Sequence, residues 1–418
     1  MTQTQQFEPF AAVVQRFLQY VAIDTQSAEG AQGYPSTEKQ KDLGRVLMEE
    51  LRELHLADVS MNDWGIVTAT LPASPGVQAP TIGFISHIDT SPEVSGKDVR
   101  PIIHSNYQGG PIVLPEGGVT ISPEASPQLN RCIGHDIITA DGRTLLGADD
   151  KAGIAEIITA VAWLLDHPER KHGPIRLAFT CDEEVGRGTV HFDVTAFGAR
   201  YAYTVDGETA GEVENETFCA DLATVQISGR NVHPGYAKGK LVSALKGAAA
   251  VVTSLPPHEA PETTQRRQGY LHPIHVSGGV EEATLRLLVR DFDEAGLKRL
   301  EGLLQEVVAE VRSRFAGLGI EITITEQYRN MRPLLEELPE LTDYALEAVR
   351  RAGGEPRLSY ARGGTDGATL TFKGLPCPNI FAGGHEFHSK REWISVSDME
   401  LAVRTLVELA ILWGDHPA

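Results

Sequence analysis

The spacing of apolar positions in the first half of the chain predicts helices and buried strands in alternation. Residues 9–23 carry apolar side chains at helical spacing, and Ser36 or Thr37 can cap a second helix that runs to Leu54. Short apolar runs rich in β-branched residues are typical of strands that are buried on both faces. Such runs occur at residues 65–71, 81–86, 174–180 and 201–205, and a helix is predicted from Asp149 to Asp166. This alternation predicts an α/β fold with a mostly parallel sheet.

The pattern changes after a short polar connector at residues 211–215. Two helices and several strands in about a hundred residues favour a small inserted α+β domain with its own core. The helices are predicted at residues 241–255 and 293–315, and the strands at 220–228, 283–292 and 320–325. The α/β pattern then resumes, so we expect one domain made of residues 1–217 and 333–418, interrupted by residues 218–332.

Composition excludes some classes of partner. The formal net charge of −20 makes nucleic acid and anionic membranes unsuitable partners. No apolar run is long enough to cross a bilayer, and the first residues lack the basic and apolar regions of a signal peptide. The four cysteines are widely separated, which is typical of reduced structural thiols. We therefore expect a cytoplasmic protein.

Acidic and imidazole side chains follow the predicted strands, where each strand ends. Ligands of parallel α/β sheets bind outside the carboxyl ends of the strands, so residues far apart in sequence can meet there. The residues at these positions are His87, Glu183, Glu184, Asp206 and His388. Each alone has an ordinary alternative, because single histidines and Glu-Glu pairs are commonly solvated surface groups. Their coincidence at strand ends favours a shared site.

Asp149 and Asp150 are adjacent acids directly before the helix that ends at Asp166. Asp is favoured at a helix N-terminus by capping and by the helix dipole, which is one reading of the pair. The other reading is a metal site, because two neighbouring carboxylates repel each other unless a cation lies between them.

Two imidazoles and three carboxylates are a donor set that suits Zn²⁺, with Co²⁺ or Mn²⁺ as substitutes. If Asp149 bridges two ions, His87 and Asp206 complete one site, and Glu184 and His388 complete the other. Each ion then keeps an open position for a shared water. The four positive charges balance three carboxylates and one hydroxide. Such a site can polarise a carbonyl group and generate a nucleophile near neutral pH.

Glu183 is the predicted proton acceptor, because its neighbour Glu184 is a ligand and Glu183 is left to face the water. Asp89 lies two residues after His87 and is expected to accept the second ring N–H of that imidazole. His385 is a rival to His388 as the last ligand.

Six motifs together resemble the M20 metallopeptidase family, and within it the tripeptide aminopeptidases. They cover nearly the whole chain in order: SHIDT at 86–90, LGADDKAG at 146–153, TCDEEVGRG at 180–188, YTVDG at 203–207, NVHPG at 231–235 and RGGTDGA at 362–368. The resemblance implies an aminopeptidase with two zinc ions per subunit that releases the first residue of short unblocked peptides. It implies a catalytic domain interrupted by a lid and dimerisation domain, hence a homodimer, and a cis peptide bond after Asp149.

The resemblance also implies roles for three residues outside the metal site. His233 would assist the transition state from the lid, and Arg290 and Arg362 would bind a substrate carboxylate or carbonyl. On sequence alone, each arginine has the alternative of a surface ion pair. This chain departs from the family pattern at two positions that concern substrate binding. Family members have an aromatic residue and an Asn where His385 and Glu386 stand. Glu386, or Asp150, is a candidate partner for a substrate's α-ammonium group.

Other activities share the same metal centre, so its ligands do not distinguish them. The alternatives within the family are a dipeptidase, a carboxypeptidase and an N-acyl amino acid deacylase. A metal-dependent binding protein without activity is a further alternative, and the presence of Glu183 beside a full ligand set argues against it.

Overall fold

The computed structural model describes residues 10–416, which form two compact units. The first unit takes in residues 10–215, 331–360 and 365–416. The second unit takes in residues 216–330 and 361–364. Within the described residues, no helix is both long and apolar enough to cross a membrane.

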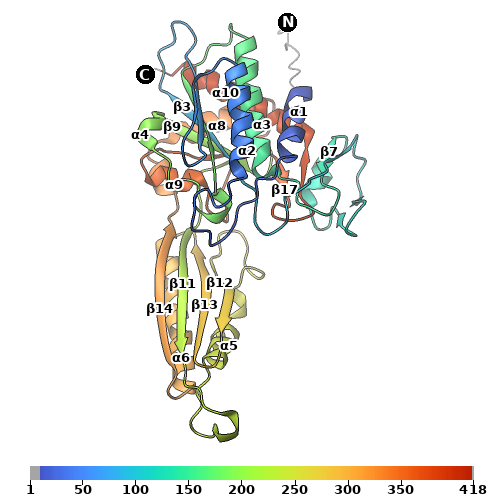
Figure 1. The fold of residues 1–418 in the computed structure, drawn as a ribbon. Helices are drawn as coiled ribbons and strands as arrows, with labels where there is room; N and C mark the ends of the chain where they lie inside the picture. The colour runs from blue at the N-terminus through green and yellow to red at the C-terminus, as the bar shows by residue number, and fades with distance from the viewer. Residues whose placement is uncertain (1–9, 417–418) are drawn as a thin grey trace. The chain divides into compact units, whose positions relative to one another are not determined.

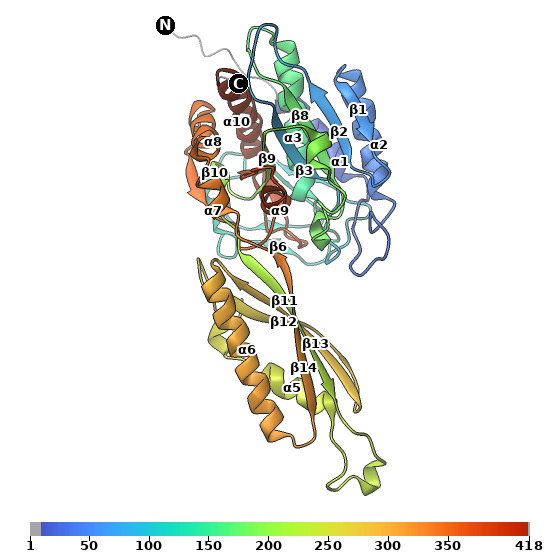
Figure 2. The same ribbon diagram turned by 90° about the vertical axis from the view of Figure 1, so that its left-hand side faces the viewer.

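The first unit is built on an eight-stranded sheet with the order β1-β2-β8-β3-β9-β16-β10-β15. Strands β3 and β9 of this sheet are labelled in Figure 1, and more of its strands are labelled in Figure 2. Its four central strands, β8, β3, β9 and β16, run parallel, which confirms the predicted fold class. The bounds are β1 (Ala57–Met61), β2 (Val67–Leu71), β3 (Ile82–His87), β8 (Ile175–Thr180), β9 (Tyr201–Gly207), β10 (Glu212–Glu214), β15 (Arg357–Ser359) and β16 (Asn379–Phe381).

Helices cover both faces of this sheet because the central strands are apolar on both sides. Phe84 and Leu177 face the larger core, and their neighbours Ile85 and Ala178 face a smaller one. The larger core is formed with α1 (Phe10–Val21), α2 (Gln40–Glu53), α3 (Ala148–Asp166), α8 (Pro339–Arg351) and α10 (Val396–Gly414). The smaller is formed with α4 (Val194–Phe197) and α9 (Asp366–Phe372), and the short α7 (Arg332–Leu335) precedes α8.

The predicted cap of the second helix is wrong. α2 begins at Gln40, and neither Ser36 nor Thr37 caps it. The hydroxyl and backbone N–H of Ser36 instead donate to the carboxylate of Asp182, at 2.5 and 2.7 Å. Asp182 lies in the turn after β8, so this long-range contact draws Ser36 away from the helix terminus.

Residues 91–143 form short strands and loops, as their content of Pro and Gly predicts. Strands β4 (Ile102–His104) and β7 (Ile137–Thr139) join β17 (Gly384–His385) and β18 (Trp393–Ser395) in a second, four-stranded sheet. A hairpin of β5 (Ile112–Val113) and β6 (Thr120–Ile121) and the 3-10 turn η1 (Pro127–Arg131) complete this region.

The second unit is an antiparallel sheet, in the order β12-β13-β11-β14, with two helices on one face (Figure 2). Its elements are β11 (Cys219–Ser228), η3 (Pro234–Tyr236), α5 (Ala244–Ser254), η4 (Pro257–Glu259), β12 (Tyr270–Gly278), β13 (Glu282–Asp291), α6 (Glu294–Arg314) and β14 (Gly319–Tyr328). Strand β12 was not predicted, because Pro273 and two histidines interrupt its apolar pattern. Residues 361–364 pack with this unit although they lie far along the chain.

Candidate metal centre

Five segments of the first unit bring ionisable side chains to the carboxyl edge of the central sheet. β3 ends at His87, β9 carries Asp206, and α3 begins beside Asp149. The turn η2 (Glu183–Val185) follows β8, and His388 lies in the loop between β17 and β18. Because these strands are parallel, all their carboxyl ends meet at one edge.

The five predicted ligands lie together, in two groups joined by Asp149. The Nε2 atom of His87 is 2.8 Å from Oδ1 of Asp149 and 3.6 Å from Oδ1 of Asp206. The Nε2 atom of His388 is 3.3 Å from Oδ2 of Asp149 and 2.7 Å from Oε2 of Glu184. The two oxygens of Asp149 therefore face different imidazoles, as they would in a bridging carboxylate.

The charges in this cluster favour cations. Burial raises the pKa of Glu184 to about 8 and that of Asp206 to about 6, and the carboxylate of Asp149 adds to both shifts. Burial lowers the pKa of His388, but its contacts with Asp149 and Glu184 outweigh this effect and raise the pKa to about 11. The Oε1 atom of Glu184 is buried without a hydrogen-bond partner. An orphaned carboxylate oxygen among acids and imidazoles fits a divalent metal ion.

Asp89 is fully buried and holds two elements of the site. His87 Nδ1 lies 3.0 Å from the main-chain oxygen of Asp89 and 3.4 Å from its Oδ1. The carboxylate of Asp89 also accepts the backbone N–H groups of Glu183 and Glu184, at 3.0 and 3.2 Å. The sequence predicted only the contact with the imidazole, since the second contact depends on the register of β3 beside β8.

Glu183, the candidate base, is placed by these backbone contacts in the turn after β8. Burial raises the pKa of its carboxyl group well above the ordinary value, and the carboxylates of Asp366 and Asp206 add to the rise. A carboxyl group in this environment is suited to accepting a proton and returning it.

The backbone around Asp149 is held by a residue that the sequence did not single out. Glu392 is buried, and its carboxylate accepts the backbone N–H groups of Leu146, Gly147 and Asp149 at 2.7, 2.9 and 3.1 Å. The bond between Asp149 and Asp150 is cis, as expected.

Asp150 lies close to His87 and Asp206. One oxygen of its carboxylate forms hydrogen bonds within the protein, and the other, Oδ1, is buried without a partner. Its Oδ2 accepts the hydroxyl of Ser86 and the backbone N–H of His87, the latter at 3.2 Å. The side chain is 0% exposed. Of the two acids predicted to meet a substrate's ammonium group, the structure therefore favours Glu386 over Asp150.

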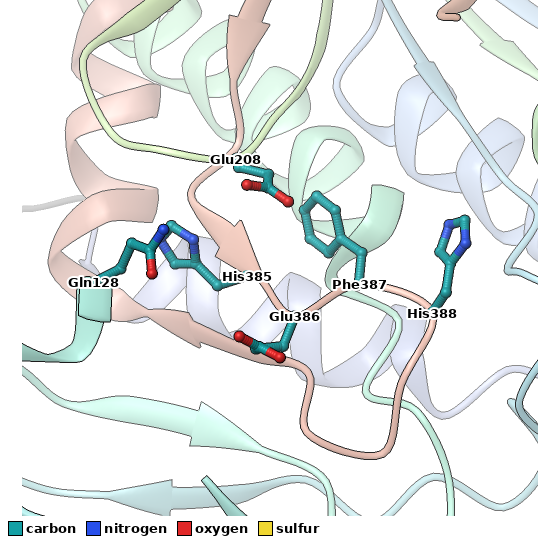
Figure 3. Close-up of a pocket in the computed structure, with 6 residues that line it drawn as sticks. All are labelled: Gln128, Glu208, His385, Glu386, Phe387 and His388. Atoms are coloured by element: carbon teal, nitrogen blue, oxygen red, sulfur yellow. The ribbon is translucent and has the colours of Figure 1, made fainter. Parts of the chain in front are cut away.

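A pocket of about 440 Å³ adjoins the cluster at His388 (Figure 3). It is lined by Gln128, Glu208, His385, Glu386, Phe387 and His388. The ring of His385 packs against that of Trp393, with 4.5 Å between ring centroids and 34° between ring planes, and forms no ion pair with any described carboxylate. His388, which contacts Asp149 and Glu184, is therefore the better candidate for the last ligand.

The three remaining predicted residues lie in the second unit. His233 is exposed, and its Nδ1 accepts the backbone N–H of Gly235 at 3.1 Å. Arg290 is buried and donates to the main-chain oxygens of Asp221 and Val289. Arg362 donates to main-chain oxygens of residues 266 and 268, which fixes its guanidinium within the same unit. The roles of these three residues stay predictions.

Comparison with known proteins gives consistent matches over the chain. The family model for peptidase family M20/M25/M40 matches residues 139–411. Peptidase T of Geobacillus sp. (strain WCH70) is 45% identical over 402 residues, covering 96% of this chain and 98% of that protein. Peptidase T of Bacillus subtilis (strain 168) is 46% identical over 399 residues, covering 95% and 97%.

Solved structures share the fold. The aminopeptidase PepT from Bacillus cereus ATCC 10987 matches with a TM-score of 0.72 at 22% identity, over 97% of this chain and 98% of that chain. A tripeptidase from Staphylococcus aureus matches with a TM-score of 0.74 at 21% identity, over the same shares. A dinuclear metal-binding M20 peptidase from Bacillus subtilis matches with a TM-score of 0.64 at 14% identity, again over the same shares.

Proposed function

The chain belongs to peptidase family M20/M25/M40, and from this membership and the site geometry we propose a two-zinc aminopeptidase that prefers tripeptides. It is a metallo-exopeptidase of the peptidase T type, and the proposal concerns its metal, its residues and its substrate ends. The observation that carries the metal assignment is the position of Asp149, whose two oxygens face His87 and His388 separately.

In this proposal His87 and Asp206 hold one zinc ion, and Glu184 and His388 hold the other, with Asp149 shared. Bound zinc would polarise the scissile carbonyl group and lower the pKa of a water molecule held there. Glu183 accepts the proton of this attacking water and then donates it to the leaving amine. Asp89 fixes both the His87 ring and the turn that carries Glu183, so the base keeps its place through both proton transfers.

The charged residues of the site determine which end of the peptide binds at which place. Glu386, beside His388, binds the free α-ammonium group of the first residue. Arg290 and Arg362 bind the far carboxylate, since a guanidinium group fits a carboxylate with two hydrogen bonds. The chain length is then measured between two charged ends. A tripeptide satisfies both ends, in keeping with the tripeptidase named among the matching structures.

The insert is proposed as a lid and as the contact of a homodimer, with His233 assisting the transition state. Lid closure excludes water and completes many active sites. The four cysteines are all free and buried, which fits the reducing cytoplasm proposed as the location.

A hydrolysis panel tests this function. The substrates are one tripeptide, its N-acetyl form, its C-terminal amide, and the matching dipeptide and pentapeptide, each with and without chelator. We expect the free tripeptide to be cleaved best, after its first residue, and only with metal present. Add-back of zinc, cobalt and manganese, with elemental analysis, gives the metal and its stoichiometry.

Two outcomes of the panel would contradict the proposal. Equal cleavage of the amide and the N-acetyl form would show that the two charged ends are not recognised, and would favour a deacylase or a carboxypeptidase. Full activity in the presence of chelator, in protein shown to contain no metal, would contradict the metal-dependent mechanism.

A further inference from the structure

A second cluster of metal-ligand side chains lies in the first unit, apart from the five ligands proposed above. It consists of Cys132, His135 and Asp398, whose donor atoms all lie within 4.8 Å of one another. Among the described residues, no hydrogen bond or ion pair joins any two of these three side chains. Ligands bound to one tetrahedral zinc ion are about 3.5 Å from each other. Donor atoms this close together can therefore share one ion.

A β-turn sets the spacing of Cys132 and His135. The backbone N–H of His135 donates to the main-chain oxygen of Cys132 at 2.9 Å, which closes the turn over residues 132–135. Gly134 has a φ of +92°, as the third residue of a type II turn requires. Two intervening residues are a common spacing between zinc ligands that are close in sequence. The turn therefore holds a thiol and an imidazole within reach of one ion.

Ser395 connects this turn to Asp398, which lies in the first turn of α10. The Oγ atom of Ser395 is 2.8 Å from Nδ1 of His135, and it accepts the backbone N–H of Asp398 at 3.3 Å. The carboxylate of Asp398 forms no hydrogen bond or ion pair with any residue between 10 and 416. A partly buried carboxylate without a partner is stabilised by a cation beside it.

A small cavity adjoins the cluster, and both Cys132 and Asp398 line it. Its volume is about 160 Å³. Sites for small organic molecules have roughly 300–1,000 Å³, and one water molecule takes up about 30 Å³. The cavity therefore suits an ion with a few water molecules. Arg131 also lines the cavity, and the two negative charges of a thiolate and a carboxylate outweigh its single positive charge.

We propose that Cys132, His135 and Asp398 bind a zinc ion in addition to the two of the proposed catalytic centre. Thiolate and imidazole ligands favour zinc over calcium, magnesium and manganese, and three protein ligands leave one position for water. The thiol releases its proton to the solvent as the ion binds, because the thiolate is the ligand. This ion takes no part in the proposed hydrolysis. It joins the turn before β7 to the start of α10.

Cobalt absorption tests the site in the intact protein, because a thiolate ligand gives cobalt(II) a charge-transfer band in the near ultraviolet. The ligands of the proposed catalytic centre contain no sulfur. Cys132 is also the only cysteine within a cluster of three metal-type donors in the described part of the chain. Chelator-treated protein is titrated with cobalt(II), and we expect this band to appear. Absence of the band at saturating cobalt would overturn the proposal.

Two variants and two controls assign the band to the cluster. Cys132→Ser should abolish the band and bind one ion fewer per chain than the wild type. Asp398→Asn keeps the shape of the side chain and should weaken cobalt binding by at least about tenfold, the lower end of the loss when a group supporting a metal site is removed.

The controls remove the same chemical groups elsewhere. Cys219→Ser replaces another buried cysteine, which lies in the second unit. Glu337→Gln removes one negative charge, as Asp398→Asn does, and Glu337 is exposed and belongs to no such cluster. Both controls should match the wild type. A band that persists in Cys132→Ser, or an unchanged cobalt affinity in Asp398→Asn, would overturn the proposal.

Two further measurements separate this site from the catalytic centre and identify its metal. His388→Ala lacks a proposed catalytic ligand and should keep the band; loss of the band there would assign it to the catalytic centre. Excess zinc should remove the band, since zinc binds such sites more tightly than cobalt, and a band that zinc leaves unchanged would contradict a zinc site. If no tripeptide is cleaved but the band is found, the proposed function fails and the additional site stands. If tripeptides are cleaved without the band, the function stands and the site is wrong.

Discussion

Glu392 accepts the backbone N–H of Asp149 at 3.1 Å, although 243 residues separate the two in the chain. Its other carboxylate oxygen accepts the N–H groups of Leu146 and Gly147. Three donors on one buried carboxylate fix the backbone that aims Asp149 at the two imidazoles. We therefore predict that Glu392 is a positioning residue, which acts on the candidate metal centre through Asp149.

Replacing Glu392 should weaken metal binding without removing a ligand. Loss of a group that orients a ligand typically lowers metal affinity about 10- to 100-fold. Glu392→Ala should show the larger effect, and Glu392→Gln a smaller one, because the amide oxygen still accepts some of the N–H groups. Zinc affinity is measured by competition with a chelator, with Glu337→Gln as the control. Unchanged affinity in both variants would show that the contact is only structural.

Glu183 and Glu184 are neighbours with different proposed tasks. Glu183→Gln should keep its metal and lose turnover by about 10²-fold or more, since an amide cannot accept the proton of the attacking water. Glu184→Gln should lose metal as well, because the contact with His388 is made by its carboxylate. Elemental analysis measures the metal content of each variant, and kcat measures its turnover. Loss of metal in Glu183→Gln and retention of metal in Glu184→Gln would show that the two assignments have to be exchanged.

The insert should carry a dimer contact and a residue needed for turnover. Nδ1 of His233 is occupied by the N–H of Gly235, so Nε2 is the atom left for a substrate oxygen. His233→Ala should keep its metal and lose turnover. Light scattering should give the mass of two chains for the intact protein. A mass equal to one chain, or full activity of His233→Ala, would contradict this prediction.

Glu156 should make the stability of the protein depend on pH. It is 0% exposed on α3, and neither carboxylate oxygen has a hydrogen-bond partner. Burial raises the pKa of this carboxyl group well above its ordinary value, and Asp398 adds to the rise. A raised folded pKa means that the folded state holds the proton more tightly. This contribution is complete below the unfolded pKa of about 4.3 and is lost as the pH rises through the folded value.

Glu156→Gln removes this titration and keeps the shape of the side chain. The variant should therefore gain thermal stability relative to the wild type at pH 8, and the gain should shrink at pH 5. A buried polar group without a partner typically costs about 1–3 kcal/mol, which sets the scale of the difference. Midpoints measured at both pH values on metal-loaded protein test this. A difference that does not change with pH would show that Glu156 is not the group responsible.

The strand-end residues could be predicted from sequence because the signals are local. His87 and Asp206 each follow a short apolar run, and parallel strands bring such positions to one edge. Glu392 could not be predicted in this way, because its contact depends on how the β17–β18 turn meets a loop far away in the sequence. The pairing of Ser36 with Asp182 was missed for the same reason. Local sequence patterns predict the helices and strands. Which polar groups support the site depends on contacts between segments that are distant in the sequence.

The spread of the site along the chain has a consequence during synthesis. A chain that has been made only as far as β9 already carries His87, Asp149, Glu184 and Asp206. It still lacks His388 and the carboxylate of Glu392, which are made only after the whole second unit. Since domains emerge and fold from the N-terminus onward, the unfinished chain holds neither the complete set of proposed ligands nor the contact that fixes Asp149. We therefore predict that truncated or nascent chains do not hydrolyse peptides, and that hydrolysis begins only after β17 and β18 have joined the sheet.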